Sequence, residues 1–232
     1  MDKDFNYQKR IAKKREHQPF ISQTDLVYEL LREDIVTLCY RAPGSKIKQE
    51  QLMNVLGVSR TPIRDALGKL REDHLITKRG KSGYHVYIPT MKDATHLCEF
   101  RMAIEIEAGK LASRRATTKD LELLRENIQA TESCKENDLK KLILLDIEFH
   151  DHLLQCCKND YMIAAYRNYR VQLRHIRNSS MTADMRDAIV SRHWSILQAI
   201  EKKNDTLIEN ALRIHLRDNL EDSINAREFS YE

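Results

Sequence analysis

Apolar residues recur at helical spacing along most of this chain, and few residues interrupt them. The 232 residues include only six glycines and four prolines, the residue types that most often end a helix. An apolar period near 3.6 residues is typical of helices with one buried face, whereas strands alternate every second residue. The sequence therefore predicts a mainly α protein that is long enough for two domains of ordinary size.

Residues 21–89 predict three helices followed by a two-stranded hairpin. The helices are expected to begin at Thr24, Gln49 and Arg60, the first of these with Thr24 as its N-cap. The alternating stretches that predict the strands cover residues 75–79 and 84–88. Three helices with a β-hairpin wing in this order make a winged helix-turn-helix.

The first 20 residues are polar and carry a cluster of cations. Its members are Lys9, Arg10, Lys13, Lys14 and Arg15. We treat residues 1–20 as a basic N-terminal arm. The arm either contacts phosphates or is only the solvated end of a helix, and the sequence leaves both interpretations open.

A domain boundary is expected at Pro89 and Thr90, and everything after it has a helical period. The expected helices cover about residues 92–115, 118–132, 137–158, 160–179, 183–202 and 205–228. Only short polar loops separate these helices. Residues 90–232 therefore predict an antiparallel all-α bundle of six to seven helices.

The third helix and the hairpin carry the residues expected to contact DNA. Ser59 is a favourable N-cap, and Arg60, Thr61 and Arg64 follow it in the first helical turns. A recognition helix enters the major groove with its N-terminal residues first, where arginine can pair with guanine. The hairpin adds Lys78, Arg79, Lys81 and Gly83, whose charges and small backbone suit a phosphate contact. Ordinary solvated cations are the competing interpretation for either element alone.

Charge and hydropathy support this division. Residues 1–90 carry 17 Lys and Arg against 11 Asp and Glu, a net charge of +6, whereas the remaining residues carry 22 against 24, a net charge of −2. This asymmetry suits a nucleic-acid-binding domain joined to a different domain. We find neither a secretory signal nor an apolar run of about 18–20 residues, and therefore expect a cytoplasmic protein without a membrane partner.

The cysteines form an odd and scattered set. They are Cys39, Cys98, Cys134, Cys156 and Cys157. Such a set is not a disulfide framework, so we expect reduced thiols, with a redox switch as the alternative.

One aspartate and three histidines of the second domain have spacings that would bring them together. Asp146 and His150 lie four residues apart on one helix face. His193 and His215 are each 11 residues from Asn204, so they are level on an antiparallel helix pair. Four such groups inside a bundle would form a divalent-metal site. A surface Asp–His pair and two satisfied core histidines are the alternative.

The stretch from Pro43 to Val86 resembles the GntR family of bacterial regulators. The shared motifs are a Pro-Gly pair, then GVSRTPxRxAL at residues 57–67, then a wing ending in Gly-aromatic-x-Val at residues 83–86. The sequence departs from the family at Lys48 and Glu50, where a serine and a basic residue are common. The resemblance implies a DNA-binding regulator, but these departures mean that the operator sequence cannot be borrowed from relatives.

Residues 92 to about 225 resemble the all-helical ligand-binding (FCD) domain of the FadR-like branch of that family. Its metal-binding members have D-x-x-x-H, then H-x-x-x-x-x-A-I, then H-L, and here Asp146, His150, His193 and His215 fill these positions. The resemblance implies a bound zinc, nickel or manganese ion. It also implies that Arg101 contacts an anionic effector, although an ion pair from Arg101 to Glu105 is an equal alternative.

Together these observations predict a homodimeric transcription regulator that binds a DNA operator and an organic or sugar acid. Two winged helices are needed because each covers one half-site. A metalloenzyme is the main alternative from another class, but no acid–base pair converges on the expected metal. We therefore expect no enzymatic activity. A third possibility is that the metal itself is the signal.

Overall fold

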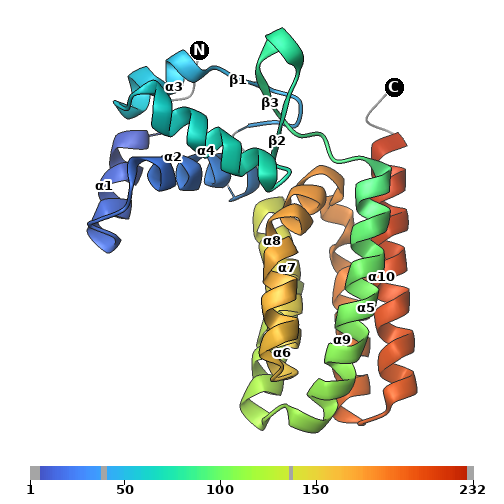
Figure 1. Cartoon of the computed structure of the whole chain (residues 1–232). Coiled ribbons are helices and arrows are strands. Elements are labelled where there is room, and N and C mark those ends of the chain that lie inside the picture. The colour runs from blue at the N-terminus through green and yellow to red at the C-terminus, as the bar shows by residue number, and fades with distance from the viewer. Residues whose placement is uncertain (1–5, 38–40, 136–137, 229–232) are drawn as a thin grey trace. The chain divides into compact units, whose positions relative to one another are not determined.

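The structure is a computed structural model, which describes residues 6–37, 41–135 and 138–228. It is mainly helical, with one small sheet (Figure 1). The chain divides between Pro89 and Thr90 into two compact units, which are described one by one. No helix in the described ranges has the length and apolar character needed to cross a membrane.

The described residues of the first unit form four α-helices and three short strands. The helices are α1 (Tyr7–His17), α2 (Gln23–Arg32), α3 (Gln49–Leu56) and α4 (Arg60–Glu72). The strands are β1 (Lys46–Ile47), β2 (Ile76–Lys78) and β3 (Tyr84–Val86). The core forms where apolar faces of α2 and α4 meet, with Leu30, Leu31, Ile63 and Leu67 fully buried. The predicted winged helix-turn-helix fold is confirmed.

The sheet holds the wing in place. Its strands are antiparallel in the order β1-β3-β2, so the predicted hairpin β2–β3 gains a third strand at its other edge. Ile47 pairs with Tyr84 and Ile76 pairs with Val86. The backbone of Gly44 donates to the carbonyl of Val86, at a φ of +80° that favours glycine.

Two local expectations need correction or extension. The N-cap of α2 is Ser22, whose hydroxyl accepts the Asp25 N–H, and not Thr24. The predicted long first helix is regular only to Arg32, after which residues Glu33–Thr37 form a π-helix. Residues 38–40 lie outside the described ranges, so the expected end of this helix before Pro43 is not described.

Residues that the sequence marked as a basic arm form helix α1. Arg10 contacts Asp34 at 2.6 Å and Glu33 at 2.9 Å, and Lys14 contacts Glu33 at 2.5 Å. The Tyr7 hydroxyl donates to the buried Asp34 carboxylate. Burial and the Asp34 charge raise the pKa of Tyr7 to about 12. Two of the five cations in the basic cluster, Arg10 and Lys14, therefore hold α1 against the rest of this unit.

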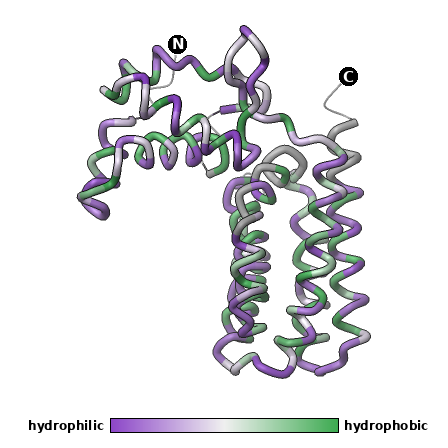
Figure 2. The backbone as a smooth tube through the Cα atoms, in the orientation of Figure 1, coloured by the Kyte–Doolittle hydropathy of each residue, from purple (hydrophilic) through white to green (hydrophobic). Residues whose placement is uncertain are grey.

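In the second unit, residues 90–135 and 138–228 form a bundle of six α-helices. They are α5 (Met91–Arg115), α6 (Thr118–Glu132), α7 (Leu139–Cys156), α8 (Asp160–Ser180), α9 (Arg186–Glu201) and α10 (Asp205–Glu228). A short 3-10 helix, Ala183–Met185, precedes α9. Apolar residues line the inside of the bundle, while hydrophilic ones alternate with them along each helix (Figure 2). The predicted all-helical bundle is confirmed.

Two helices of the bundle approach each other closely. At Gly109 of α5, a Cβ atom would lie 2.8 Å from Ile208 Cγ2 and 2.9 Å from Leu212 Cδ1 of α10. The absent side chain thus lets α10 lie directly along α5 (Figure 1). This contact holds the N-terminal half of α10, which includes His215, against α5.

The four cysteines in the described ranges are buried free thiols. They are Cys98, Cys134, Cys156 and Cys157. Burial raises the pKa of Cys156 to about 12 and also raises those of Cys98 and Cys157. Because the thiolate is the reactive form, these environments favour inert thiols over a redox switch. Cys39 lies outside the described residues.

Candidate nucleic-acid interface and metal centre

The N-terminal end of α4 presents its polar side to solvent. Pro62 and Ile63 are buried on the inner side of the helix. Four predicted DNA contacts are exposed on the other side, namely Ser59, Arg60, Thr61 and Arg64. Ser59 occupies the N-cap position, yet its side chain makes no capping hydrogen bond.

Neither arginine of this surface is held by a strong internal partner. Arg60 makes no ion pair with a described residue. Arg64 makes one contact of 3.4 Å with Asp65, and both of those side chains are largely exposed. Exposed pairs of this kind contribute little to stability, so both guanidinium groups are available to an outside anion.

The wing carries the other predicted DNA contacts. Lys78, Arg79 and Lys81 are exposed around a short 3-10 turn, Gly80–Ser82, which links β2 to β3. Gly83 has a φ of +89°, a conformation that side chains rarely adopt. The ring of His85 fixes the turn, because it contacts the Ser82 hydroxyl at 3.0 Å and the Gly44 carbonyl at 3.2 Å. The wing is thus an ordered, basic and exposed loop.

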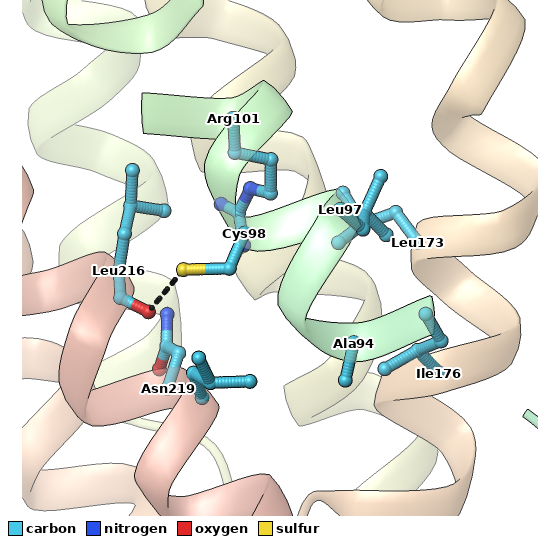
Figure 3. A pocket seen from close by; sticks show the side chains of 9 residues that line it. Ala94, Leu97, Cys98, Arg101, Leu173, Ile176, Leu216 and Asn219 are labelled. Carbon is cyan, nitrogen blue, oxygen red and sulfur yellow. Dashed lines mark hydrogen bonds between the residues drawn. The ribbon is translucent and has the colours of Figure 1, made fainter. Parts of the chain in front are cut away.

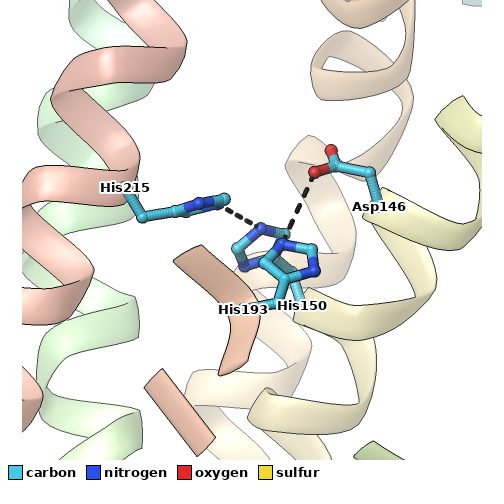
Figure 4. A group of neighbouring side chains, drawn as sticks. All are labelled: Asp146, His150, His193 and His215. Carbon is cyan, nitrogen blue, oxygen red and sulfur yellow. Dashed lines mark hydrogen bonds and ion pairs between the residues drawn. The ribbon is translucent and has the colours of Figure 1, made fainter. Parts of the chain in front are cut away.

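The four predicted metal ligands come together inside the second unit (Figure 4). Asp146 and His150 project from α7, His193 from α9 and His215 from α10. One ligand atom from each lies within 4.8 Å of the others, and all four side chains are buried. Phe149 stacks on the His193 ring with centroids 3.7 Å apart, which fixes the orientation of that imidazole.

The spacing of the donor atoms fits one divalent ion. His150 Nε2 and His215 Nε2 are 2.9 Å apart, and His193 Nε2 is 3.6 Å from Asp146 Oδ1. Two atoms bound to one ion at about 2.1 Å lie about 3.0–3.4 Å apart for octahedral or tetrahedral angles. Three imidazoles and one carboxylate are also a donor set that zinc, nickel and manganese accept. The residues therefore fit the metal that the resemblance implied.

A buried carboxylate connects this cluster to Arg101. Glu105 Oε2 lies 2.7 Å from His150 Nδ1, and Glu105 Oε1 accepts from Arg101 Nε at 2.5 Å. Burial opposes the charge on Glu105, but Arg101 and His150 outweigh it and lower the Glu105 pKa to about 2. The same pairing raises the pKa of Arg101 against the effect of burial. Glu105 and Arg101 are thus a charged pair inside the bundle.

Arg101 also lines a small cavity between α5, α8 and α10 (Figure 3). The other lining residues are Ala94, Leu97, Cys98, Leu173, Ile176, Leu216, Asn219 and Leu220. The cavity volume is about 30 Å³, which is room for about two water molecules. Arg101 is only 4% exposed, and its Nη2 has no hydrogen-bond partner in the described part of the chain. Both interpretations of Arg101 thus have structural support, because one guanidinium pairs with Glu105 and lines a cavity.

Sequence reasoning missed two residues of this site. Glu105 was considered only as a partner of Arg101, although it also contacts His150. Asn219 was not considered, yet its Nδ2 lies 2.9 Å from His215 Nε2 and it also lines the cavity. The available signal for Asn219 was its position four residues after His215, on the same face of α10.

Two family matches divide the chain at the same place as the structure. Residues 23–86 match the bacterial regulatory proteins of the gntR family, and residues 96–218 match the FCD domain. The FCD match alone covers more than half of the 232 residues.

Individual proteins similar to this chain are regulators. The HTH-type transcriptional repressor RspR of Escherichia coli (strain K12) is 27% identical over 194 residues, which cover 83% of this chain and 85% of RspR. The probable D-xylose utilization operon transcriptional repressor of Paenarthrobacter nicotinovorans is 25% identical, over 75% of this chain and 76% of that protein. Among solved structures, a putative GntR transcriptional regulator from Rhodococcus sp. RHA1 has a TM-score of 0.75 at 22% identity. It covers 89% of this chain and 99% of its own.

Proposed function

This chain belongs to the gntR family of bacterial regulatory proteins and carries an FCD domain, and we propose that it acts as a homodimer. We propose further that its affinity for the operator responds to a small carboxylate, which binds beside a divalent metal. Membership of this family makes it a DNA-binding transcriptional regulator with an effector-binding domain, and not an enzyme. The dimer, the metal and the class of effector are the proposed part.

The exposed end of α4 and the wing supply the proposed DNA contacts. Arg60 and Arg64 would enter the major groove, where arginine reads guanine O6 and N7. Lys78, Arg79 and Lys81 would neutralise phosphates beside it. One winged helix covers one half-site, so two chains are proposed to bind a palindromic operator. Two relatives named as repressors favour repression as the output.

The convergence of Asp146, His150, His193 and His215 within 4.8 Å carries the rest of the proposal. These residues would hold the metal, and the bound ion would supply a fixed positive charge inside the bundle. Asn219 contacts His215 and also lines the cavity, so this single side chain lies between the proposed ligands and the cavity. Arg101 adds a second positive charge to the cavity wall. The unused Nη2 donor of Arg101 in the cavity wall, with the charge of the ion nearby, favours an anion such as a carboxylate.

An organic acid is larger than the cavity of about 30 Å³, so the leucine and isoleucine side chains that line it must move apart. A ligand that binds only this expanded arrangement shifts the population toward it. Leu173 and Ile176 belong to α8, whereas Ala94 and Leu97 belong to the start of α5. The first turns of α5 follow the boundary at Pro89 directly, so an effector is proposed to act on the DNA-binding unit through α5.

Elemental analysis of the purified full-length chain tests the metal site. We expect about one divalent ion per chain, and loss of the ion in His193→Ala and in His215→Ala. His152→Ala is the matched control, because His152 lies on α7 outside the cluster. Unchanged metal content in the first two variants would show that the assigned site is wrong.

A thermal-shift screen of organic and sugar acids, followed by operator binding, tests the effector. The operator is first obtained by selection from random DNA duplexes. We expect at least one acid to raise the melting temperature and to change the affinity for the selected duplex. A change in DNA affinity on adding metal alone, with no response to any acid, would instead identify the metal as the signal.

A further inference from the structure

The Glu105 carboxylate contacts Arg101 through one oxygen atom and His150 through the other, and the buried Tyr166 hydroxyl also faces it. Oε1 accepts from Arg101 Nε at 2.5 Å, and Oε2 lies 2.7 Å from His150 Nδ1. The side chains of Arg101, Glu105 and His150 are at most 5% exposed. Water cannot screen these contacts well. A change in the contact with Arg101 therefore alters how strongly the negative charge of Glu105 acts on His150, and a change at His150 likewise affects Arg101.

At His150 the carboxylate determines which nitrogen can bind a metal. A carboxylate accepts hydrogen bonds, so Glu105 Oε2 at 2.7 Å favours the tautomer of His150 with the proton on Nδ1. The lone pair is then on Nε2, which lies 2.9 Å from His215 Nε2 within the ligand cluster. A carboxylate behind a histidine ligand also makes the imidazole a stronger donor, and removing such a partner typically weakens metal affinity 10–100-fold.

At Arg101 the same carboxylate competes with any anion in the cavity. The guanidinium pairs with Glu105 through Nε, while Nη2 has no hydrogen-bond partner in the described ranges. An anion that pairs with Arg101 takes a share of its positive charge away from Glu105. More of the negative charge of Glu105 then acts on His150.

We propose that Glu105 is a positioning residue that couples the cavity to the metal centre, so that an anion on Arg101 and a metal on His150 strengthen each other's binding. This inference depends on the metal site of the proposed function. By linkage, the factor by which the anion tightens metal binding equals the factor by which the metal tightens anion binding.

Zinc affinity of the full-length chain, measured by competition with a chelator, tests the coupling without a known effector. We expect Glu105→Gln to weaken zinc binding about 10–100-fold. Arg101→Gln should have the opposite effect and tighten zinc binding, because Glu105 then acts on His150 alone. Glu105→Gln combined with Arg101→Gln should resemble Glu105→Gln. Glu209→Gln is the control. Glu209 lies on α10 and pairs with Lys110 of α5, away from the cluster of proposed ligands.

Opposite effects of Glu105→Gln and Arg101→Gln on zinc affinity distinguish coupling from a purely structural ion pair. If both single variants weaken zinc binding, or neither changes it, the proposal is wrong. If the wild-type chain binds no zinc, the proposed metal site itself is wrong, and this inference fails with it.

A second measurement does not depend on the folding of Arg101→Gln. Formate, as a small probe carboxylate, should tighten zinc binding to the wild-type chain. It should have a smaller effect on Glu105→Gln. Equal responses of the two proteins, or no response of the wild type, would contradict the coupling.

Discussion

Arg101 lies where both interpretations that the sequence left open are compatible with its contacts. Its spacing to Glu105 predicted an ion pair, and its place in the family motif predicted an effector contact. In the structure Nε makes the ion pair, while Nη2 is buried at the cavity without a partner in the described part of the chain. Guanidinium has five N–H donors in a rigid fork, so the contact with Glu105 leaves other donors for a second partner.

The recognition arginines provide a prediction at the level of single residues. We expect Arg60→Ala or Arg64→Ala to weaken binding to the selected operator by about 1–3 kcal/mol if each contact is bidentate to guanine. Arg71→Ala is the matched control, because Arg71 is exposed near the other end of α4 and should have a smaller effect. Fluorescence anisotropy at fixed salt measures the affinities. Equal effects of all three substitutions would show only a general attraction to phosphate.

The convergence of the four residues that could hold a metal was predictable from the sequence, because helical spacing determines how side chains face each other. Asp146 and His150 lie four residues apart on α7, and His193 and His215 are level across the turn at Asn204. The contact between Glu105 and His150 was not predictable in this way. It joins α5 to α7, and no spacing within one helix reports on the packing of two separate helices.

At the level of elements, the helix ends were harder to predict than the helices. Thr24 was an acceptable N-cap by residue type, but Ser22 performs that role. Both residues are good caps, so residue type alone could not decide between them. The sequence does not decide the role of α1, because a polar segment with five cations is compatible both with an arm that contacts phosphates and with a solvated helix end. What stabilises it is the contact of Arg10 and Tyr7 with Asp34, which lies 24 and 27 residues further along the chain.

The start of α6 gives a prediction for an element boundary. Asp120 accepts from the Thr117 backbone N–H at 2.8 Å and pairs with Lys158 at 2.9 Å. We expect Asp120→Ala to lower the free energy of unfolding by about 1 kcal/mol, as for other lost caps. Urea unfolding measures it, with the neighbouring exposed Lys119→Ala as control.

The same cap gives a pH dependence. The hydrogen bonds from Lys158 and Thr117 lower the pKa of Asp120 to about 2 from an ordinary value of 3.8. A group with a lowered folded pKa stabilises the protein above its unfolded pKa, and this contribution disappears as the pH falls through the folded value. The difference between wild type and Asp120→Ala should therefore be constant above about pH 5 and shrink toward pH 3. A difference that grows on acidification would contradict this origin.

At the level of the whole molecule, the sequence predicted a winged helix-turn-helix and an all-helical bundle. Apolar residues alternate at Tyr84–Val86 and recur about every 3.6 residues after Pro89. This change in spacing occurs where the structure divides into two units. The cavity and the Glu105 link were beyond sequence analysis, because both depend on how α5, α7, α8 and α10 pack together. Patterns within single helices predict which faces are buried, but not which buried charges meet.

The division into two units predicts that zinc stabilises one of them selectively. Trp194 is the only tryptophan, and it packs against the core of the second unit next to the ligand His193. Its fluorescence therefore reports unfolding of residues 90–232, whereas far-UV circular dichroism reports both units. Zinc at about 100 times its Kd should stabilise the unit that binds it by about 2.7 kcal/mol.

We therefore expect zinc to raise the midpoint of the Trp194 fluorescence transition in a thermal melt. Circular dichroism also detects unfolding of the first unit, which Trp194 fluorescence does not follow. We expect the midpoint of that additional transition to remain unchanged when zinc is added. His215→Ala should abolish the shift, because it removes a ligand, and His152→Ala should retain it. If both probes report a single transition that zinc moves as a whole, then the two units unfold together and metal binding stabilises the DNA-binding unit as well.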